Sequence, residues 1–358
     1  MTTHLLLVGG FLGAGKTTLL LKAAQHLVTQ GYCVGMVTND QAQDLVDTAM
    51  ARQYEIPVME VTGGCFCCRF PDLLASVKRL QESIRPDIIL CEPVGSCTDL
   101  ISTIFRPLYA YYPTEFRVAP LTVLVDPFRE PKSFPQEVGY IYEKQLSEAN
   151  LIVVSKKDLL NSETTQAHLQ DLQQSYPAAQ ALAVSAQKGE GLQDWLEICL
   201  QQSSNIEQVL EMNYQTYAQG EAYLAWLNAH GLVSSALPFS ASAWMASIFQ
   251  GIEQACQVQG AAIAHVKMHV TTETQVLKGS LTQLGRPMSW DLGPTDEKTT
   301  QAHFLLNVRV TTTPKILETL IRQVLTQVVG QMGTHLEMTD LACFSPLPPR
   351  PTYRLLSL

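Results

Sequence analysis

The stretch that decides the fold of this 358-residue chain reads Gly10-Phe-Leu-Gly-Ala-Gly15-Lys16-Thr17-Thr18. It follows an apolar run at residues 5–8, precedes a helical pattern, and matches the phosphate-loop pattern G-x-x-x-x-G-K-S/T at every position. Glycines in such a loop let backbone N–H groups converge on phosphate oxygens, and the N-terminus of the following helix adds partial positive charge. The stretch therefore predicts a nucleotide-phosphate site, whose expected contacts are Gly10, Gly13, Ala14, Gly15, Lys16, Thr17 and Thr18.

The catalytic candidates are Lys16, Glu92 and Asp47. Lys16 should reach the β- and γ-phosphates, and the Thr17 hydroxyl should ligate Mg²⁺. Glu92 ends an apolar run, where a carboxylate can hold Mg²⁺ or orient the attacking water. Gly95 lets the backbone approach the γ-phosphate and move when that phosphate leaves. Asp47 lies in a polar, switch-like segment; the alternative is an Asp near the N-cap of a solvated helix.

Two later segments indicate which nucleotide is bound. Ser155-Lys156-Lys-Asp158 is close to the Asn/Thr-Lys-x-Asp guanine motif, with Ser155 where Asn is usual. The Asp158 carboxylate can accept hydrogen bonds from guanine N1–H and the 2-amino group, a donor pair that adenine lacks, while Lys156 lies along the base. Ser185-Ala186 opens a Ser-Ala-x-x-Gly-x-Gly loop of the kind that backs guanine. Either segment alone could be a polar loop, but their order after the phosphate loop favours GTP.

Three of the nine cysteines fall within four residues, as Cys65, Cys67 and Cys68. Thiolates at about 2.3 Å suit Zn²⁺, and such soft ligands also suit Cu(I). Three ligands leave one coordination position open, which suits a site that releases its metal, and no neighbouring C-x-x-C completes a set of four. Redox-active or inert thiols are the alternatives. The other six are expected to be core or incidental residues: Cys33, Cys91, Cys97, Cys199, Cys256 and Cys343.

The alternation of short apolar runs with amphipathic stretches predicts an α/β fold with a mostly parallel sheet over residues 1–204. Near-continuous apolar strands indicate a sheet covered on both faces. We expect a linker at 205–220 and a smaller α+β domain at 221–358. Strands are expected at 5–8, 34–38, 57–61, 87–91, 121–126, 151–155 and 181–185, then at 264–270, 274–280 and 304–310. Helices are expected at 73–84, 221–229, 241–258 and 314–328.

Charge and hydropathy exclude several classes of protein. The chain carries 24 Lys and Arg against 33 Asp and Glu, a net charge of −9. An acidic surface argues against a nucleic-acid groove, which needs clustered cations. No apolar stretch reaches the roughly 18 residues of a membrane span, and the N-terminus lacks the basic region of a signal peptide. We therefore expect a cytoplasmic protein that contacts neither nucleic acid nor a membrane.

Together these motifs resemble the CobW family of metal-centre assembly GTPases, relatives of HypB and UreG in the SIMIBI class of P-loop NTPases. The resemblance covers about residues 4–200. It implies a GTPase fold, GTP–Mg²⁺ binding, slow hydrolysis, and transfer of zinc or cobalt from the three clustered cysteines to a client metalloprotein. Two features depart from the family. Residues 39–43 read Asn-Asp-Gln-Ala-Gln where Asn-Glu-Phe-Gly-Glu is common, and the His-rich tract of many relatives is missing.

Three functions compete on the sequence alone. The first is a GTP-dependent metallochaperone, monomeric or dimerising with nucleotide or metal. The second is a P-loop kinase of a small molecule, and the third is a nucleotide-gated scaffold for cofactor assembly without metal transfer. In the C-terminal part, His265 and His269 lie four apart on an expected strand and so share a face; partly exposed strand histidines are the interpretation favoured over metal or client contact.

Overall fold

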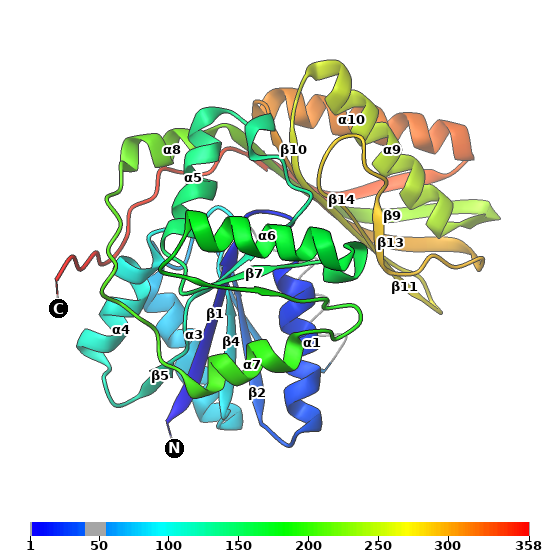
Figure 1. The fold of residues 1–358 in the computed structure, drawn as a ribbon. Helices are drawn as coiled ribbons and strands as arrows, with labels where there is room; N and C mark the ends of the chain where they lie inside the picture. The colour runs from blue at the N-terminus through cyan, green and yellow to red at the C-terminus, as the bar shows by residue number, and fades with distance from the viewer. Residues whose placement is uncertain (1, 40–54, 358) are drawn as a thin grey trace.

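The computed structural model describes residues 2–39 and 55–357, in which two sheets form the framework (Figure 1). The first sheet has the strand order β3-β2-β4-β1-β6-β7-β8, with β5 beside β1, and every pairing in it is parallel. Its strands are β1 (Thr3–Gly10), β2 (Val34–Asn39), β3 (Val58–Val61), β4 (Ile88–Glu92), β5 (Phe116–Val118), β6 (Thr122–Val125), β7 (Leu151–Val154) and β8 (Gln180–Ala183).

Helices cover both faces of this sheet, because successive side chains of a strand point to opposite faces. In β1, Leu5 and Leu7 pack in one apolar cluster and Leu6 and Val8 in the other. The first cluster receives side chains from α3 (Phe70–Ile84), α4 (Arg106–Tyr111), α5 (Gln136–Ser147) and α6 (Ser162–Ser175). The second receives side chains from α1 (Lys16–Thr29) and α7 (Leu192–Gln201). The predicted parallel α/β fold is therefore confirmed, and each of its seven predicted strands overlaps an observed one.

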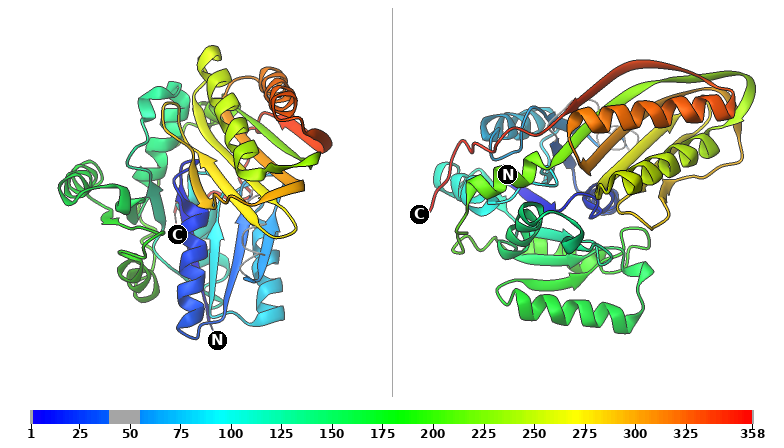
Figure 2. Two further views of the ribbon diagram at one scale, coloured as in Figure 1. Left: turned by 90° about the vertical axis from the view of Figure 1, so that its right-hand side faces the viewer. Right: turned by 90° about the horizontal axis from the view of Figure 1, so that it is seen from above.

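The second sheet is antiparallel, with the order β12-β11-β10-β13-β9-β14. Its strands are β9 (Leu224–Ser240), β10 (Ile263–Thr271), β11 (Val276–Leu281), β12 (Ser289–Leu292), β13 (Lys298–Thr311) and β14 (His335–Phe344). The helices α9 (Ala241–Gln259) and α10 (Pro314–Met332) lie on one face of it, where they form the core of a C-terminal α+β unit (Figures 1 and 2). Figure 2 shows the other face of this sheet turned toward the parallel sheet.

The helix predicted at 221–229 is wrong, because strand β9 begins at Leu224. Both faces of this part of β9 are covered. Leu224 and Trp226 pack in the core of the parallel sheet, whereas Ala225 and Leu227 pack under the C-terminal helices. A strand that is apolar on both faces loses the period of two that distinguishes it from a buried helix.

The segment predicted as a linker is partly helical. After α7 residues 202–213 form neither helix nor strand. Asn213 Oδ1 then accepts hydrogen bonds from two backbone N–H groups and caps α8 (Tyr214–Ala222). Helix α8 packs against α5. The domain limits 1–204 and 221–358 stay predictions. Within the described ranges no helix combines the length and apolarity needed to cross a membrane.

After β14 the chain returns to the parallel domain. Figures 1 and 2 show this C-terminal segment, in red, running from the antiparallel sheet back past α8. Residues 345–357 contain no helix or strand, as the proline-rich sequence predicts. We call residues 345–357 the C-terminal strap.

Candidate functional site

The phosphate loop joins β1 to α1 and is shaped by its glycines. Gly15, with φ 98°, occupies the N-cap of α1, so the helix begins at Lys16. Gly10 has φ 125°, and a Cβ there would lie 2.5 Å from the carbonyl oxygen of Leu124. Only glycine fits this left-handed, crowded position. The loop thus presents backbone N–H groups and a helix N-terminus at one point, the arrangement that binds phosphate.

Two predicted phosphate-side residues meet at this loop. The Thr17 hydroxyl donates to Glu92 Oε1 at 2.9 Å, because β4 lies next to β1 and Glu92 ends it. Lys16 Nζ donates to the carbonyl oxygens of Gly10 at 2.8 Å and Phe11 at 3.4 Å. A hydroxyl and a carboxylate beside a helix N-terminus are oxygen ligands of the kind that suit Mg²⁺.

The loop after β4 rests on the phosphate loop. A Cβ on Gly95 would lie 2.8 Å from Leu12 Cδ2 and 3.1 Å from Leu12 Cα, so any side chain there would push the two loops apart. Gln145 Nε2 holds the same loop by donating to the carbonyl oxygens of Gly95 and Cys97 at 3.0 and 2.9 Å. The other predicted switch residue, Asp47, lies outside the described residues, as do residues 40–43.

The two segments predicted to contact guanine also meet. Asp158 Oδ1 accepts a hydrogen bond from Ser185 Oγ at 2.6 Å, and the Ser155 hydroxyl donates to the Val125 carbonyl at 3.1 Å. Lys156 Nζ pairs with Asp126 at 2.7 Å. These loops border a cavity of about 260 Å³. Its lining includes Gly15, Thr18, Ser155, Lys156, Asp158, Ala186 and, from the C-terminal sheet, Trp290.

The polar face of the C-terminal sheet covers the phosphate loop. In β10, Val266, Met268 and Val270 face α9 and α10, whereas His265 and Lys267 face the other way. Strands β9, β11 and β13 repeat this alternation. A second cavity, of about 110 Å³, therefore lies between the phosphate loop and the C-terminal unit. The C-terminal side chains that line it are Trp226 and the polar residues His265, Lys267, Lys278, Ser280, Asn307 and Arg309.

The charged members of that set are buried or partly buried. Arg309 Nη1 donates to the carbonyl oxygens of Leu227 and Val308 at 3.0 Å each, and its guanidinium lies 4.0 Å from the Trp226 ring centroid. Lys278 Nζ lies 3.4 Å from Asp291 Oδ2. The sequence motifs did not identify Lys267, Lys278 and Arg309 as site residues. The signal was present, since each is a polar residue at alternate positions in an otherwise apolar strand.

His265 and His269 share a face of β10 as expected, but His265 is buried and lines the phosphate-side cavity. Burial, with nearby Lys267 and Lys16, lowers the pKa of His265 well below its ordinary value. Burial and Lys278 lower the pKa of His269 to about 4. Both imidazoles are therefore neutral at physiological pH.

Arg129 connects the phosphate loop to the C-terminal sheet. Its guanidinium donates to the carbonyl oxygens of Leu12 at 2.7 Å, Ala264 at 2.9 Å and Ile263 at 3.1 Å, and also to that of Thr282. The side chain is 7% exposed, and burial lowers its pKa to about 10. One side chain thus holds together backbone groups that lie more than 250 residues apart in the sequence.

The predicted metal ligands form a compact cluster after β3. The three sulfur atoms of Cys65, Cys67 and Cys68 lie within 4.8 Å of one another. Asn39 fixes the loop, since its Oδ1 accepts from Phe66 N at 2.7 Å and its amide donates to the Val61 and Gly64 carbonyls. The sulfur separations are 2.6 Å for Cys65–Cys67, 3.3 Å for Cys65–Cys68 and 3.7 Å for Cys67–Cys68. Three soft donors this close fit a thiophilic ion such as Zn²⁺.

The C-terminal strap lies directly on this cluster. The backbone N–H of Arg350 donates to Cys68 Sγ at 3.1 Å, and that of Thr352 donates to the Cys67 carbonyl at 2.9 Å. Tyr353 packs edge-on against Phe70, with ring centroids 5.4 Å apart. Hydrogen bonds to a ligand sulfur stabilise its thiolate form and fix its orientation.

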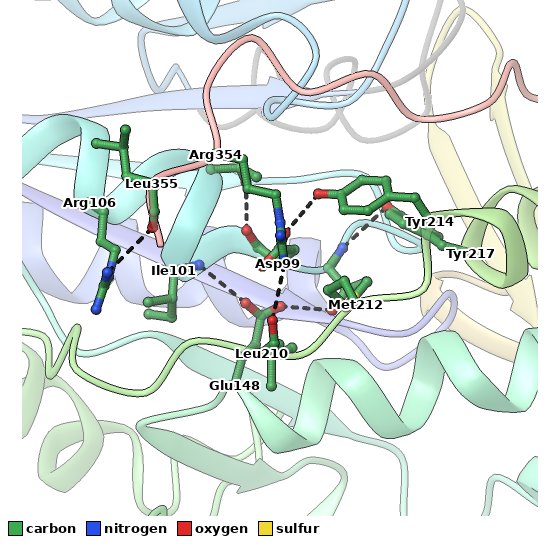
Figure 3. Close-up of polar contacts among 12 residues, drawn as sticks. Asp99, Ile101, Arg106, Glu148, Leu210, Met212, Tyr214, Tyr217, Arg354 and Leu355 are labelled. Atoms are coloured by element: carbon green, nitrogen blue, oxygen red, sulfur yellow. Dashed lines mark hydrogen bonds and ion pairs between the residues drawn. The ribbon is translucent and has the colours of Figure 1, made fainter. Parts of the chain in front are cut away.

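A largely buried polar network anchors the strap through Arg354 (Figure 3). Asp99 Oδ2 accepts from Arg354 Nε of the strap at 2.6 Å and from the Tyr214 hydroxyl of α8 at 2.7 Å. Glu148 accepts from Thr98 Oγ1 at 2.9 Å and from Ile101 N at 3.2 Å. Burial and the nearby Asp99 raise the pKa of Glu148 to about 8.

The fold and site define a class of protein. A parallel sheet whose first strand leads through a glycine loop into a helix, with a carboxylate at the end of the adjacent strand, is a P-loop NTPase fold. The family model of the CobW/HypB/UreG nucleotide-binding domain matches residues 4–183. The chain belongs to this family.

Curated relatives match the same part of the chain. The zinc chaperone CobW of Sinorhizobium sp is 26% identical over 216 residues, which cover 51% of this chain and 58% of that protein. The zinc chaperone YeiR of Escherichia coli strain K12 is 30% identical over 166 residues, or 45% and 48% of the two chains. The aligned region thus spans only about half the length of these relatives.

Solved structures also match. The Zn(II)-bound YjiA GTPase of E. coli aligns over 92% of this chain and 99% of its own, with 16% identity and a TM-score of 0.37. HypB of Helicobacter pylori in complex with nickel aligns over 55% and 86%, with 18% identity and a TM-score of 0.41.

Proposed function

We propose that this chain is a GTP-dependent metallochaperone that binds GTP with Mg²⁺, hydrolyses GTP slowly, and delivers Zn²⁺ or Co²⁺ to a client metalloprotein. Its cargo site is the cluster of Cys65, Cys67 and Cys68. The observation that carries the proposal is the occurrence, in one P-loop domain, of a nucleotide pocket and a three-sulfur cluster. Membership of the CobW/HypB/UreG family and similarity to two proteins named as zinc chaperones support it.

The phosphate loop supplies the nucleotide contacts. Backbone N–H groups of residues 10–18 bind the phosphates, Lys16 neutralises their charge, and Thr17 and Glu92 hold Mg²⁺. Mg²⁺ held by these side chains would neutralise part of the negative charge of the phosphates. Glu92 lies close enough to the Thr17 hydroxyl to share this role, since the two side chains already hydrogen-bond at 2.9 Å. We propose Asp47 as the acid of the switch segment.

The base is held at the cavity beside β7. Asp158 reads the guanine edge, Lys156 lies along the ring, and Ser185 orients the Asp158 carboxylate through their 2.6 Å hydrogen bond. A nucleotide-binding screen tests this assignment. We expect GTP and GDP to bind and ATP to be excluded, whereas tight ATP binding with GTP excluded would instead identify a kinase.

The C-terminal sheet forms the side of the phosphate-side cavity that lies opposite the phosphate loop. Lys267, Lys278 and Arg309 bring positive charge to the phosphate-side cavity, where it opposes the charge of the nucleotide phosphates. Arg309 is held by backbone carbonyls and by Trp226. We propose that these residues hold the triphosphate and that hydrolysis is slow unless a partner protein supplies an arginine to the phosphates.

Linkage between metal and nucleotide tests the chaperone function. If metal affinity differs between the GTP and GDP states, nucleotide affinity must change reciprocally with metal. We expect Zn²⁺ titrations of anaerobically purified protein to show different affinities with a non-hydrolysable GTP analogue and with GDP. Cys67→Ala should abolish binding, while Cys256→Ala, in the C-terminal core, should not. Equal affinity in both nucleotide states would contradict the proposal.

A further inference from the structure

A fourth sulfur lies beside the thiol cluster. Cys97 comes from the loop that follows β4, thirty residues after Cys67, and its Sγ lies 3.8 Å from Cys67 Sγ. Cys97 is buried, as expected of a core residue, but its thiol contacts the sulfur of Cys67.

We propose that Cys97 is the fourth ligand of the cargo metal, so that Cys65, Cys67, Cys68 and Cys97 form a tetrahedral four-sulfur site for a thiophilic divalent ion. This inference rests on the proposed metal binding at the first three cysteines. It changes the character of the site, because a site with three protein ligands is open to exchange, whereas a four-cysteine site is closed.

Two of the sulfur separations already fit this coordination. Four sulfur atoms at about 2.3 Å from one Zn²⁺ lie about 3.8 Å from one another in a tetrahedron. The Cys67–Cys97 and Cys67–Cys68 separations, 3.8 and 3.7 Å, already have this value. Cys65 lies 2.6 Å from Cys67 and 3.3 Å from Cys68, so its sulfur must move outward by about 1 Å. Cys97 stands outside the group of sulfur atoms that all lie within 4.8 Å of one another, so the loop after β4 must also move toward the other thiols when the metal binds.

The backbone around Cys97 places this ligand on the nucleotide-facing loop. Cys97 follows Gly95, which rests on Leu12 of the phosphate loop, and Glu92, which contacts Thr17. Gln145 holds the carbonyls of Gly95 and Cys97 together. A displacement of this loop on loss of the γ-phosphate would therefore withdraw one of four ligands and leave three, which weakens the site and opens a position for the client.

Counting sulfur ligands in the wild-type protein tests the inference directly. The full chain, purified anaerobically, is loaded with one equivalent of Zn²⁺ and studied by X-ray absorption at the zinc edge. We expect four sulfur neighbours at about 2.3 Å. Three sulfurs with one oxygen or nitrogen would overturn the role of Cys97 and leave the proposed function standing. Failure of the wild type to bind Zn²⁺ would contradict both.

Substitution gives a second readout. With Co²⁺ as the probe, Cys97→Ala should lower the intensity of the sulfur-to-cobalt charge-transfer band by about a quarter and weaken affinity at least about tenfold. The matched control is Cys91→Ala, a buried cysteine of β4 six positions earlier, which should change neither quantity. Circular dichroism and GDP binding confirm that both variants are folded. Equal Co²⁺ spectra and affinities for Cys97→Ala and Cys91→Ala would refute the inference.

The proposed withdrawal of Cys97 has its own measurement. In the wild type the ratio of Co²⁺ affinities with a GTP analogue and with GDP should differ from one, and in Cys97→Ala it should approach one. An unchanged ratio in Cys97→Ala would show that another group couples the two sites.

Discussion

Replacing Arg129 should separate the C-terminal sheet from the phosphate loop. The guanidinium donates to the carbonyl oxygens of Leu12, Ile263 and Ala264 at 2.7–3.1 Å, and to that of Thr282, in a place that is 93% shielded from solvent. A hydrogen bond to a charged group contributes about 1.5–3 kcal/mol, and a buried acceptor left without a donor costs about 1–3 kcal/mol. The guanidinium carbon of Arg129 also lies 5.6 Å from the ring centroid of Phe11 and 5.5 Å from that of Phe134.

These contributions do not add, because one guanidinium makes them all and its own burial opposes them. We therefore expect Arg129→Ala to lower the free energy of unfolding by about 3 kcal/mol, the upper end of the range for one hydrogen bond to a charged group. Since Leu12 belongs to the phosphate loop, nucleotide affinity should fall as well, by about tenfold.

Urea unfolding followed by tryptophan fluorescence measures the free energy of unfolding, and titration with a fluorescent GDP analogue measures nucleotide affinity. Arg129→Met, which keeps an apolar stem but no donor, separates hydrogen bonding from packing and should lose nearly as much stability as Arg129→Ala. The control is Arg322→Ala on the exposed face of α10, where Arg322 pairs with Glu318 of the same helix, and it should change stability by less than about 0.5 kcal/mol. A loss below about 1 kcal/mol for Arg129→Ala would refute the assignment of Arg129 as the connection between the two units.

Three further outcomes are expected. Glu148→Gln should make the protein more stable at pH 8 but not at pH 4.5. The wild-type carboxyl has a pKa of about 8 in the folded state against an ordinary value of 4.5. Between these two values the folded state holds the extra proton, so wild-type stability falls as pH rises through this range. Equal slopes of stability against pH in both proteins would contradict this. Lys267→Ala should weaken GTP binding more than GDP binding and reduce the salt dependence of GTP binding, because Lys267 lines the phosphate-side cavity. Substitution of the exposed Lys315 by Ala should change neither quantity. Trp290→Ala should lower GDP affinity about tenfold, which is within the range for loss of an aromatic contact with a base. An unchanged GDP affinity would show that the base binds away from the cavity that Trp290 lines.

The parallel domain was predictable because its signals are local. The phosphate loop fixes β1 and α1, and parallel strands bring their carboxyl ends to one edge of the sheet, so that Glu92 meets Thr17 and Asp158 meets Ser185. The strand order requires contacts between segments far apart in the chain, which no local pattern contains.

The C-terminal unit was less predictable for a related reason. Alternation in β10 is clear, but the use of its polar face depends on a second domain that covers it. Leu224 and Trp226 are apolar because they face that domain, and this removed the alternation that would have identified β9. Cys97 was placed among ordinary core cysteines because its distance from Cys67 depends on where the loop after β4 lies, and neither segment shows this alone.

The return of the chain from β14 to the parallel domain has a mechanical consequence. The two units are joined twice, once through residues 202–213 and α8 and again through the C-terminal strap, and Asp99 binds a side chain from each connection. A body attached at two points can rotate about the axis through them but cannot slide freely. Any rocking of the antiparallel sheet over the nucleotide would therefore pull on the strap. The strap would transmit that tension to Cys68 through the backbone N–H of Arg350 and to Cys67 through the backbone N–H of Thr352.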